Sequence, residues 1–179
     1  MLQLNFSPFP QLTTDRLVLR QLVQNDVIAI AALRNNETVN QYIDRPKTSS
    51  RAEALQFIDK ITKGINNNES MYWVITLKDN DSLIGTLCLW NFIAEEDTAE
   101  TGYELHPAFH GKGIMHEALQ AVIDFGFKNL RLNLITAFTS PANIASIKLL
   151  EKNNFKMDTT GKYSQQNTEG EIIYVLGRI

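Results

Sequence analysis

The chain has 179 residues, with 17 lysines and arginines against 20 aspartates and glutamates, which gives a formal charge of −3. Hydrophobic residues make up 44% of the sequence and charged residues 21%, which argues against a disordered chain. The slightly acidic balance gives no electrostatic support for binding a nucleic acid. A length of this order predicts one domain, spanning residues 1–179.

Cys88 is the only cysteine, which excludes an internal disulfide and a multi-thiolate metal site. No cationic residue lies near it in sequence to activate the thiol, so Cys88 is not expected to act as a nucleophile. No apolar run approaches the ~20 residues that a membrane-spanning helix needs. The first twelve residues do not resemble a signal peptide. We therefore expect a soluble cytoplasmic protein with no membrane partner.

Periodicity predicts a strand and two helices in the first third of the chain. Residues 16–22 alternate apolar and polar positions, as a half-buried strand does. From Asn25, which is the expected cap, the apolar spacing becomes helical. Residues 48–53 resemble the start of a second helix, whose apolar stripe continues to Ile65.

The rest of the chain mixes strands and helices. Residues 71–77 and 83–92 are rich in β-branched and aromatic side chains and predict a hairpin around the polar turn 78–82. Further elements are expected as a strand at 98–105, a helix ending near 129, a strand at 132–138, a helix at 143–153 and a strand at 172–176. This order predicts an α/β (α+β) domain with a sheet covered by helices.

The segment Leu105-His-Pro-Ala-Phe-His-Gly-Lys-Gly-Ile-Met115 carries the most specific pattern. Two glycines one residue apart, Gly111 and Gly113, let successive backbone N–H groups point the same way at a helix N-terminus. Such a concave N-terminus binds phosphate. The spacing matches neither the Walker pattern nor the dinucleotide fingerprint, which needs a glycine where the chain has His116.

This segment resembles motif A of the GCN5-related N-acetyltransferases (GNAT), whose Gln/Arg-x-x-Gly-x-Gly/Ala loop binds the diphosphate of acetyl-CoA. It is most similar to the branch that contains the ribosomal-protein N-terminal (RimJ/RimL-like) acetyltransferases. The matching positions are Leu105, Pro107, Phe109, Gly111, Gly113, Glu117 and Ala118. Residues 12–20, 84–85 and 143–155 are similar to further motifs of that branch. The chain departs from the family at His110, Met115 and Asn154.

The resemblance implies a mixed, mostly antiparallel sheet that is splayed near Glu104 to admit pantetheine, with helices on both faces. It implies acetyl-CoA as co-substrate, an amine as acceptor, and a monomer or homodimer. The implied cofactor-binding residues are Leu105, His106, His110, Gly111, Lys112, Gly113, Ile114, Met115, Asn143 and Ser146. No metal is expected, because the spacing of the three histidines does not support zinc.

The implied reaction needs a neutral amine, whereas a lysine has a pKa of about 10.4 and an α-amine one of about 7.7–8.0. The resemblance places a general-base glutamate on the strand before the loop, and Glu104 is our candidate for base or amine-orienting group. By strand alternation it shares a face with Gly102 and Glu100. The alternatives are Glu100, a water molecule, or Glu104 as a solvated or salt-bridged carboxylate.

Many superfamily members place a tyrosine acid just before the glutamate of the last helix, where this chain has Leu150. Ser146 is the usual serine of the branch and is expected to reach the cofactor sulfur. Its alternative is a helix hydroxyl that bonds back to a carbonyl. Asn143 is either the helix cap, a cofactor contact, or both.

The acceptor is the least determined part of the prediction. A protein or peptide N-terminal α-amine fits the branch best, and a polyamine, amino acid or aminoglycoside is the nearest alternative. Residues 42–60 and the segment after Phe155, which carry the least pattern, are expected to form the acceptor site. A non-catalytic acyl-CoA sensor is the alternative from another class, because the tyrosine acid is missing.

Overall fold

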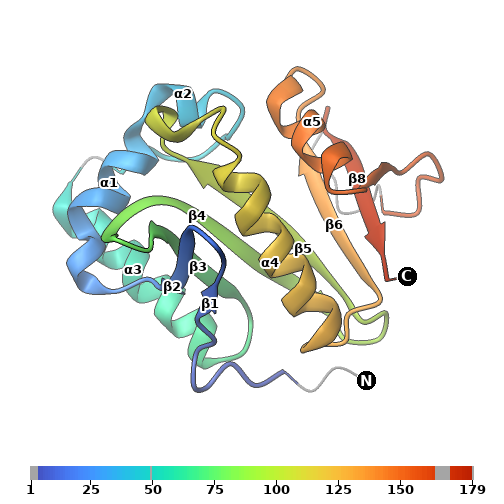
Figure 1. Ribbon diagram of the computed structural model, residues 1–179, viewed down its shortest axis with the longest axis horizontal. Helices are drawn as coiled ribbons and strands as arrows, with labels where there is room; N and C mark the ends of the chain where they lie inside the picture. Colours follow the sequence, from blue (N-terminus) through green and yellow to red (C-terminus); the bar gives the residue numbers. More distant parts are fainter. Residues whose placement is uncertain (1–3, 49, 164–169, 179) are drawn as a thin grey trace.

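The computed structural model describes residues 4–48, 50–163 and 170–178. Within these residues, eight strands form a sheet in the order β1-β2-β3-β4-β5-β6-β8-β7 (Figure 1). Neighbouring strands are antiparallel except β5 and β6, which run parallel. The predicted mixed and mostly antiparallel sheet is therefore confirmed.

The strands are β1 (Leu12–Thr13), β2 (Leu17–Gln21), β3 (Met71–Leu77), β4 (Asn80–Ile93), β5 (Thr98–Leu105), β6 (Leu134–Thr139), β7 (Lys156–Met157) and β8 (Ile172–Gly177). The helices are α1 (Val27–Asn35), α2 (Glu37–Asn40), α3 (Arg51–Asn66), α4 (Ile114–Lys128) and α5 (Ile144–Lys152). Two short 3-10 helices, η1 (Gln24–Asp26) and η2 (Pro107–Phe109), precede α1 and α4.

Most of the longer elements lie where periodicity predicted them. Ser50 and Glu53 form a capping box at the start of α3, which confirms the helix start predicted over 48–53. Ser49, within that range, lies outside the described residues. The predicted cap at Asn25 is wrong, because the chain first makes η1, in which the Asp26 carboxylate accepts from the Val23 amide at 3.0 Å. The strands β1 and β7 and the helix α2 were not predicted, since two to four residues show no period.

Helices cover both faces of the sheet, as successive residues of β3 demonstrate (Figure 1). The ring of Trp73 packs edge-on against Phe125 of α4, with 5.7 Å between centroids. The next ring along the strand, Tyr72, packs against Phe57 of α3 at 5.8 Å. Because side chains alternate along a strand, α4 and α3 lie on opposite faces. Among the described residues, no helix is long and apolar enough to cross a membrane.

Candidate active site

The sheet opens along the second half of β5. Thr98, Ala99 and Glu100 pair with β6, whereas the pairing with β4 continues to Leu105. Beyond Glu100, β5 therefore has a neighbour on one side only. This opening beside Glu104 is the predicted splay.

The backbone of β5 turns a defined set of polar groups toward this opening. The His106 amide donates to the Ile84 carbonyl of β4 at 2.8 Å, so even-numbered residues bond to β4. By the same alternation, the amides and carbonyls of Tyr103 and Leu105 point away from β4. These groups face the side from which β6 has diverged.

The loop before α4 ends in a helix N-terminus that has no side-chain cap. Gly111 and Gly113 have φ of +73° and +74°, a conformation that only glycine adopts without strain. Gly113 is the N-cap and offers no side-chain acceptor, whereas Ser50 caps α3 and Asn143 caps α5. The first amide of α4 to bond back is that of Glu117, at 3.1 Å from the Gly113 carbonyl. The preceding amides of this first turn can therefore receive an anion.

Glu117 connects the start of α4 to the residues just before β2. Its carboxylate accepts hydrogen bonds from the Thr14 hydroxyl (2.5 Å), the Arg16 amide (2.9 Å) and Arg16 Nε (2.7 Å). Arg16 Nη1 in turn donates to the carbonyl of Lys112 at 3.0 Å. Partial burial acts to raise the pKa of Glu117, but the bonds from Thr14 and Arg16 outweigh it and hold the pKa below its usual value.

The other predicted loop residues use their side chains to hold the loop itself. His110 Nε2 lies 2.8 Å from the Leu105 carbonyl, and Lys112 Nζ donates to the Ala108 carbonyl at 2.8 Å. His106 Nδ1 accepts from the Ala108 amide at 3.3 Å. The side chains of Ile114 and Met115 are buried. The amides at the start of α4, which no side chain caps, are therefore the backbone donors that this segment leaves for an anionic cofactor.

A pair of hydroxyl groups spans from β5 to α5. Ser146 Oγ lies 2.8 Å from the Tyr103 hydroxyl, while the Ser146 amide donates to the Asn143 side chain at 3.1 Å. Burial raises the pKa of Tyr103 to about 12, against the smaller lowering effect of the Ser146 bond. Leu150, at the family's tyrosine position, is fully buried. Tyr103 was not predicted as a functional residue. The sequence feature that could have identified it is its position next to Glu104 on the strand before the loop.

Glu104 lies on the opposite face of β5 and forms a bidentate ion pair with Arg45. Its two oxygens accept from Arg45 Nη1 and Nη2 at 2.5 and 2.8 Å. Both side chains are largely buried, with exposed fractions of 13% for Glu104 and 10% for Arg45. Arg45 Nε donates to the Asn40 side chain at 2.9 Å. Arg45 was missed because its segment carries no periodic pattern.

Two further residues surround this ion pair on the face covered by α3. The guanidinium of Arg34 stacks 3.8 Å above the ring of Phe57, and its pKa is lowered by burial and by the charge of Arg45. Burial, with the nearby charge of Glu104, raises the pKa of Tyr72 above its ordinary range. We call Arg34, Arg45, Tyr72 and Glu104 the acceptor-side cluster.

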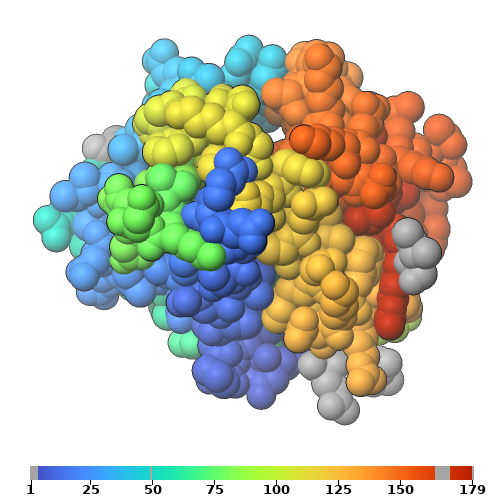
Figure 2. Space-filling view, in the orientation of Figure 1, coloured from blue at the N-terminus to red at the C-terminus, as the bar shows by residue number. Residues whose placement is uncertain are grey.

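The opening at β5, the loop before α4, the Tyr103–Ser146 pair and the acceptor-side cluster lie at the same end of the molecule. In Figure 1 the N-terminus of α4, α5 and the segment containing α2 lie together at this end. Figure 2 shows the surface of the loop region (yellow) close to that of α5 (orange), with the α2 segment (light blue) beside them.

Two other titratable groups lie on the Glu104 side of β4 and β5. Burial raises the pKa of Cys88 to about 12, so its thiol is neutral. Burial, together with the charge of Glu171, raises the pKa of Glu100 to about 7 despite hydrogen bonds from Asn91 and Trp90. Glu100 is paired on both sides, by Trp90 and Thr136, and therefore lies before the opening.

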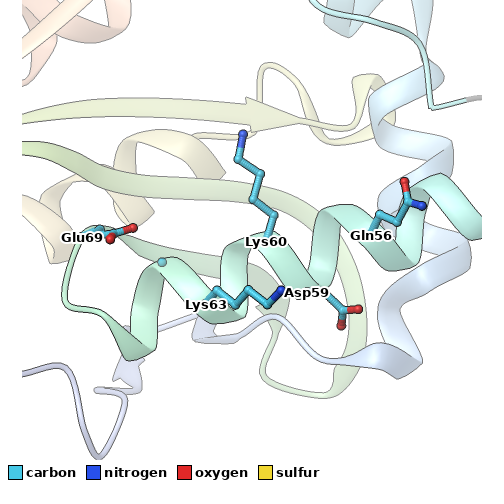
Figure 3. Close-up of a pocket in the computed structure, with 6 residues that line it drawn as sticks. Gln56, Asp59, Lys60, Lys63 and Glu69 are labelled. Atoms are coloured by element: carbon cyan, nitrogen blue, oxygen red, sulfur yellow. The ribbon is translucent and has the colours of Figure 1, made fainter.

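Outside this region the structure offers little that resembles a reaction site. A depression of about 450 Å³ lies along α3 (Figure 3). It is lined by Gln56, Asp59, Lys60, Lys63, Gly64 and Glu69. The first three fall within residues 42–60, which were expected to form the acceptor site, but none was a predicted catalytic or cofactor-binding residue. Within the described ranges, no three His, Cys, Asp or Glu side chains come together as a metal site would require.

Comparison with known proteins identifies the class. Residues 16–156 match the family model of the acetyltransferase (GNAT) domain. The chain is 32% identical over 160 residues to the uncharacterized N-acetyltransferase YoaA of Bacillus subtilis, covering 89% of this chain and 90% of YoaA.

Solved structures share the fold. A GNAT-family acetyltransferase from Bacillus anthracis superposes with a TM-score of 0.78 at 22% identity, covering 94% of this chain and 98% of the other. RimL, a ribosomal alpha-N-protein acetyltransferase solved in complex with coenzyme A, superposes with a TM-score of 0.81 at 20% identity, covering 94% and 98%.

The chain belongs to the GNAT acetyltransferase family. It is an acetyl-CoA-dependent N-acetyltransferase, and acetyl-CoA is its co-substrate. The predicted family, fold and class of enzyme are thereby confirmed.

Proposed function

We propose that this acetyltransferase acts on the N-terminal α-amine of a peptide or protein in the cytoplasm. The observation that carries the proposal is the opening of the sheet at β5, with Tyr103 and Ser146 on one face and Glu104 on the other. The likeness to RimL, a ribosomal alpha-N-protein acetyltransferase, supports this acceptor. The cluster around Glu104 holds two arginines and one carboxylate, which disfavours polycationic acceptors such as polyamines and aminoglycosides.

The proposed cofactor contacts follow from the donors that the fold leaves available. The first-turn amides of α4 and the loop Gly111–Gly113 would hold the diphosphate. The backbone of Tyr103 and Leu105 would bind the pantetheine amides and the thioester carbonyl. Asn143 and the side chains of His106, His110 and Lys112 would add contacts around them.

The proposed reaction is direct attack without an acyl-enzyme. The acceptor nitrogen forms a bond to the thioester carbonyl carbon, and the carbon–sulfur bond then breaks. The sulfur takes a proton from Ser146, which regains one from solvent through the Tyr103 hydroxyl. The ammonium proton passes to Glu104 directly or through water. Each Glu104 oxygen accepts one bond from Arg45 and keeps a lone pair for this purpose.

Glu100 is the alternative base, because a pKa of about 7 suits a general base. Glu100 is paired with strands on both sides of β5 and therefore lies outside the opening, which favours Glu104 as the base. A non-catalytic acyl-CoA sensor is the second candidate function, favoured by the apolar Leu150 at the family's acid position. The Tyr103–Ser146 pair opposes it by supplying hydroxyls at the opening.

The test is release of free CoA from acetyl-CoA, followed with a thiol reagent against N-terminal peptides, polyamines and aminoglycosides. We expect turnover with peptides, and a fall of about a hundredfold for Glu104→Gln, the lower end of general-base effects. The loss should be greatest below the pKa of the amine, where more of the acceptor is protonated.

Glu95→Gln, which alters an exposed carboxylate, is the matched control and should behave as wild type. A loss confined to Glu100→Gln would transfer the role of base to Glu100. Acetyl-CoA binding without CoA release for any amine would establish the sensor instead.

A further inference from the structure

We propose that the acceptor carries an anionic group, a carboxylate or a phosphate, close to its reactive amine, and that Arg34 and Arg45 bind this group. The inference rests on the proposed function and names the chemical class of its acceptor. Three features of the acceptor-side cluster carry it: a guanidinium without a full set of partners, a buried hydroxyl without a hydrogen-bond partner of normal length, and an ion pair that covers Glu104.

Arg34 has unused hydrogen-bonding capacity. Its Nε donates to the Thr48 hydroxyl at 3.1 Å, and its guanidinium lies over Phe57 at 3.8 Å. Among the described residues, its two terminal nitrogens have no hydrogen-bond partner. Glu104 is engaged by both terminal nitrogens of Arg45, so the cluster retains one positive charge. The planar fork of an arginine held in this way matches a carboxylate or phosphate.

Tyr72 supplies a second open position beside Arg34. The residue is only 8% exposed, and within the described part of the chain its hydroxyl has no hydrogen-bond partner of normal length. Its one polar side-chain contact, with Thr86, is longer and acts weakly to lower the phenol pKa. The ring packs edge-on against Phe57, on which Arg34 stacks, so the phenol and the guanidinium share one neighbour. A buried hydroxyl is costly when it is left unpaired. The raised pKa of Tyr72 keeps it protonated, so it can donate to an anionic oxygen.

The ion pair over Glu104 explains why the anion and the amine belong to one acceptor. An ammonium group bound through the lone pairs that Arg45 leaves free on Glu104 shares the single negative charge that balances Arg45. Leaving a buried guanidinium without its counter-charge is strongly unfavourable. An acceptor that brings both charges replaces both halves of the pair: its amine binds Glu104 and its anion binds Arg45 and Arg34. A simple cation offers only half of this exchange.

The experiment compares kcat/KM for peptides that share an N-terminal serine and differ only at the second residue, which is glutamate, phosphoserine, glutamine or lysine. We expect the glutamate or phosphoserine peptide to exceed the lysine peptide by about tenfold or more, as one charge-assisted contact predicts. The two anionic peptides separate a carboxylate preference from a phosphate preference. Arg34→Met should reduce the ratio to about twofold or less, and Arg34→Lys should restore part of it.

Lys63→Met is the matched control, because it removes an exposed cation from α3 outside the cluster and outside residues 42–60, and should leave the ratio unchanged. Equal kcat/KM for all four peptides would overturn the inference while the proposed function stands. A preference that survives in Arg34→Met would also overturn it. Absence of turnover with every peptide would reject the proposed function, and the inference with it.

Discussion

Two adjacent residues, Tyr103 and Glu104, divide the proposed chemistry between the two faces of β5. Strand alternation sends the Tyr103 hydroxyl to Ser146 of α5 and the Glu104 carboxylate to Arg45. A thioester lying in the opening between β5 and β6 would have hydroxyls on one side and the acceptor-side cluster on the other. The leaving sulfur and the arriving amine therefore need not compete for the same groups.

Removing the phenol oxygen tests the hydroxyl pair. We expect Tyr103→Phe to lower kcat by about tenfold, less than a full general acid contributes, because a thiol of pKa about 8.5 needs only partial acid assistance. KM for acetyl-CoA should change little. Ser146→Ala should cost a similar factor, and the double variant should cost little more than either, because groups that act as a unit are not additive. Initial rates over a range of acetyl-CoA concentrations measure both constants.

Tyr174→Phe is the control, since it removes a phenol oxygen whose partner, Glu151, is not one of the proposed site residues. Fully additive losses in the double variant, or a rise in KM alone, would reject a shared proton-donating role for Tyr103 and Ser146.

The raised pKa of Glu100 predicts a pH dependence of stability. Its pKa is about 7 in the folded chain and 4.5 ordinarily, so the folded state binds more protons between these values. Stability is therefore lost as pH rises from 4.5 to 7 and is constant above. Glu100→Gln removes this effect, and its melting temperature should exceed that of the wild type at pH 8 and equal it near pH 4.5. A difference that does not change with pH would contradict the prediction.

At the scale of elements, the uncapped N-terminus of α4 is the feature that distinguishes it from α3 and α5. Asn143 and Ser50 satisfy a first-turn amide of their helices, whereas Gly113 satisfies none. Glu117 and Arg16 nevertheless hold the loop to β2. The first-turn amides of α4 are thus fixed in position and have no side-chain acceptor, as an anion site requires.

Alanine in place of Gly113 separates backbone strain from cofactor binding. A left-handed φ costs a non-glycine residue about 1–2 kcal/mol, so Gly113→Ala should lower the melting temperature. It should also raise KM for acetyl-CoA by about tenfold, because a displaced amide loses a charge-assisted bond. Gly170, with φ of +92°, is the matched control: Gly170→Ala should lose similar stability without changing KM. Equal effects of the two variants on KM would contradict the diphosphate assignment.

The elements that show a clear hydrophobic period or a cap could be predicted from the sequence. The hairpin of β3 and β4, β5 and the longer helices follow from periods of two and 3.6 and from caps such as Ser50. Asn154 adopts φ of +64°, as expected where the family has glycine. Short elements such as α2 were not predicted, because two to four residues are too few to show a hydrophobic period.

At the scale of the whole molecule, the site joins segments that sequence separates widely. Arg45 meets Glu104 across 59 positions, and Tyr103 meets Ser146 across 43. No local period encodes such a contact, so the sequence predicted Glu104 and Ser146 as candidates but not their partners. Resemblance supplied the loop and the family, whereas the acceptor-side cluster emerged only when α1, α3 and the segment after α2 were folded against the sheet.

The proposed reaction is acetyl transfer to a peptide α-amine at this opening. Its most direct measurement is mass spectrometry of a serine-initiated peptide that also contains an internal lysine, after incubation with acetyl-CoA and the protein. We expect one acetyl group on the α-amine and none on the lysine side chain, with strongly reduced product for Glu104→Gln. Acetylation of the lysine alone, or an unmodified peptide beside turnover of a small amine, would contradict it.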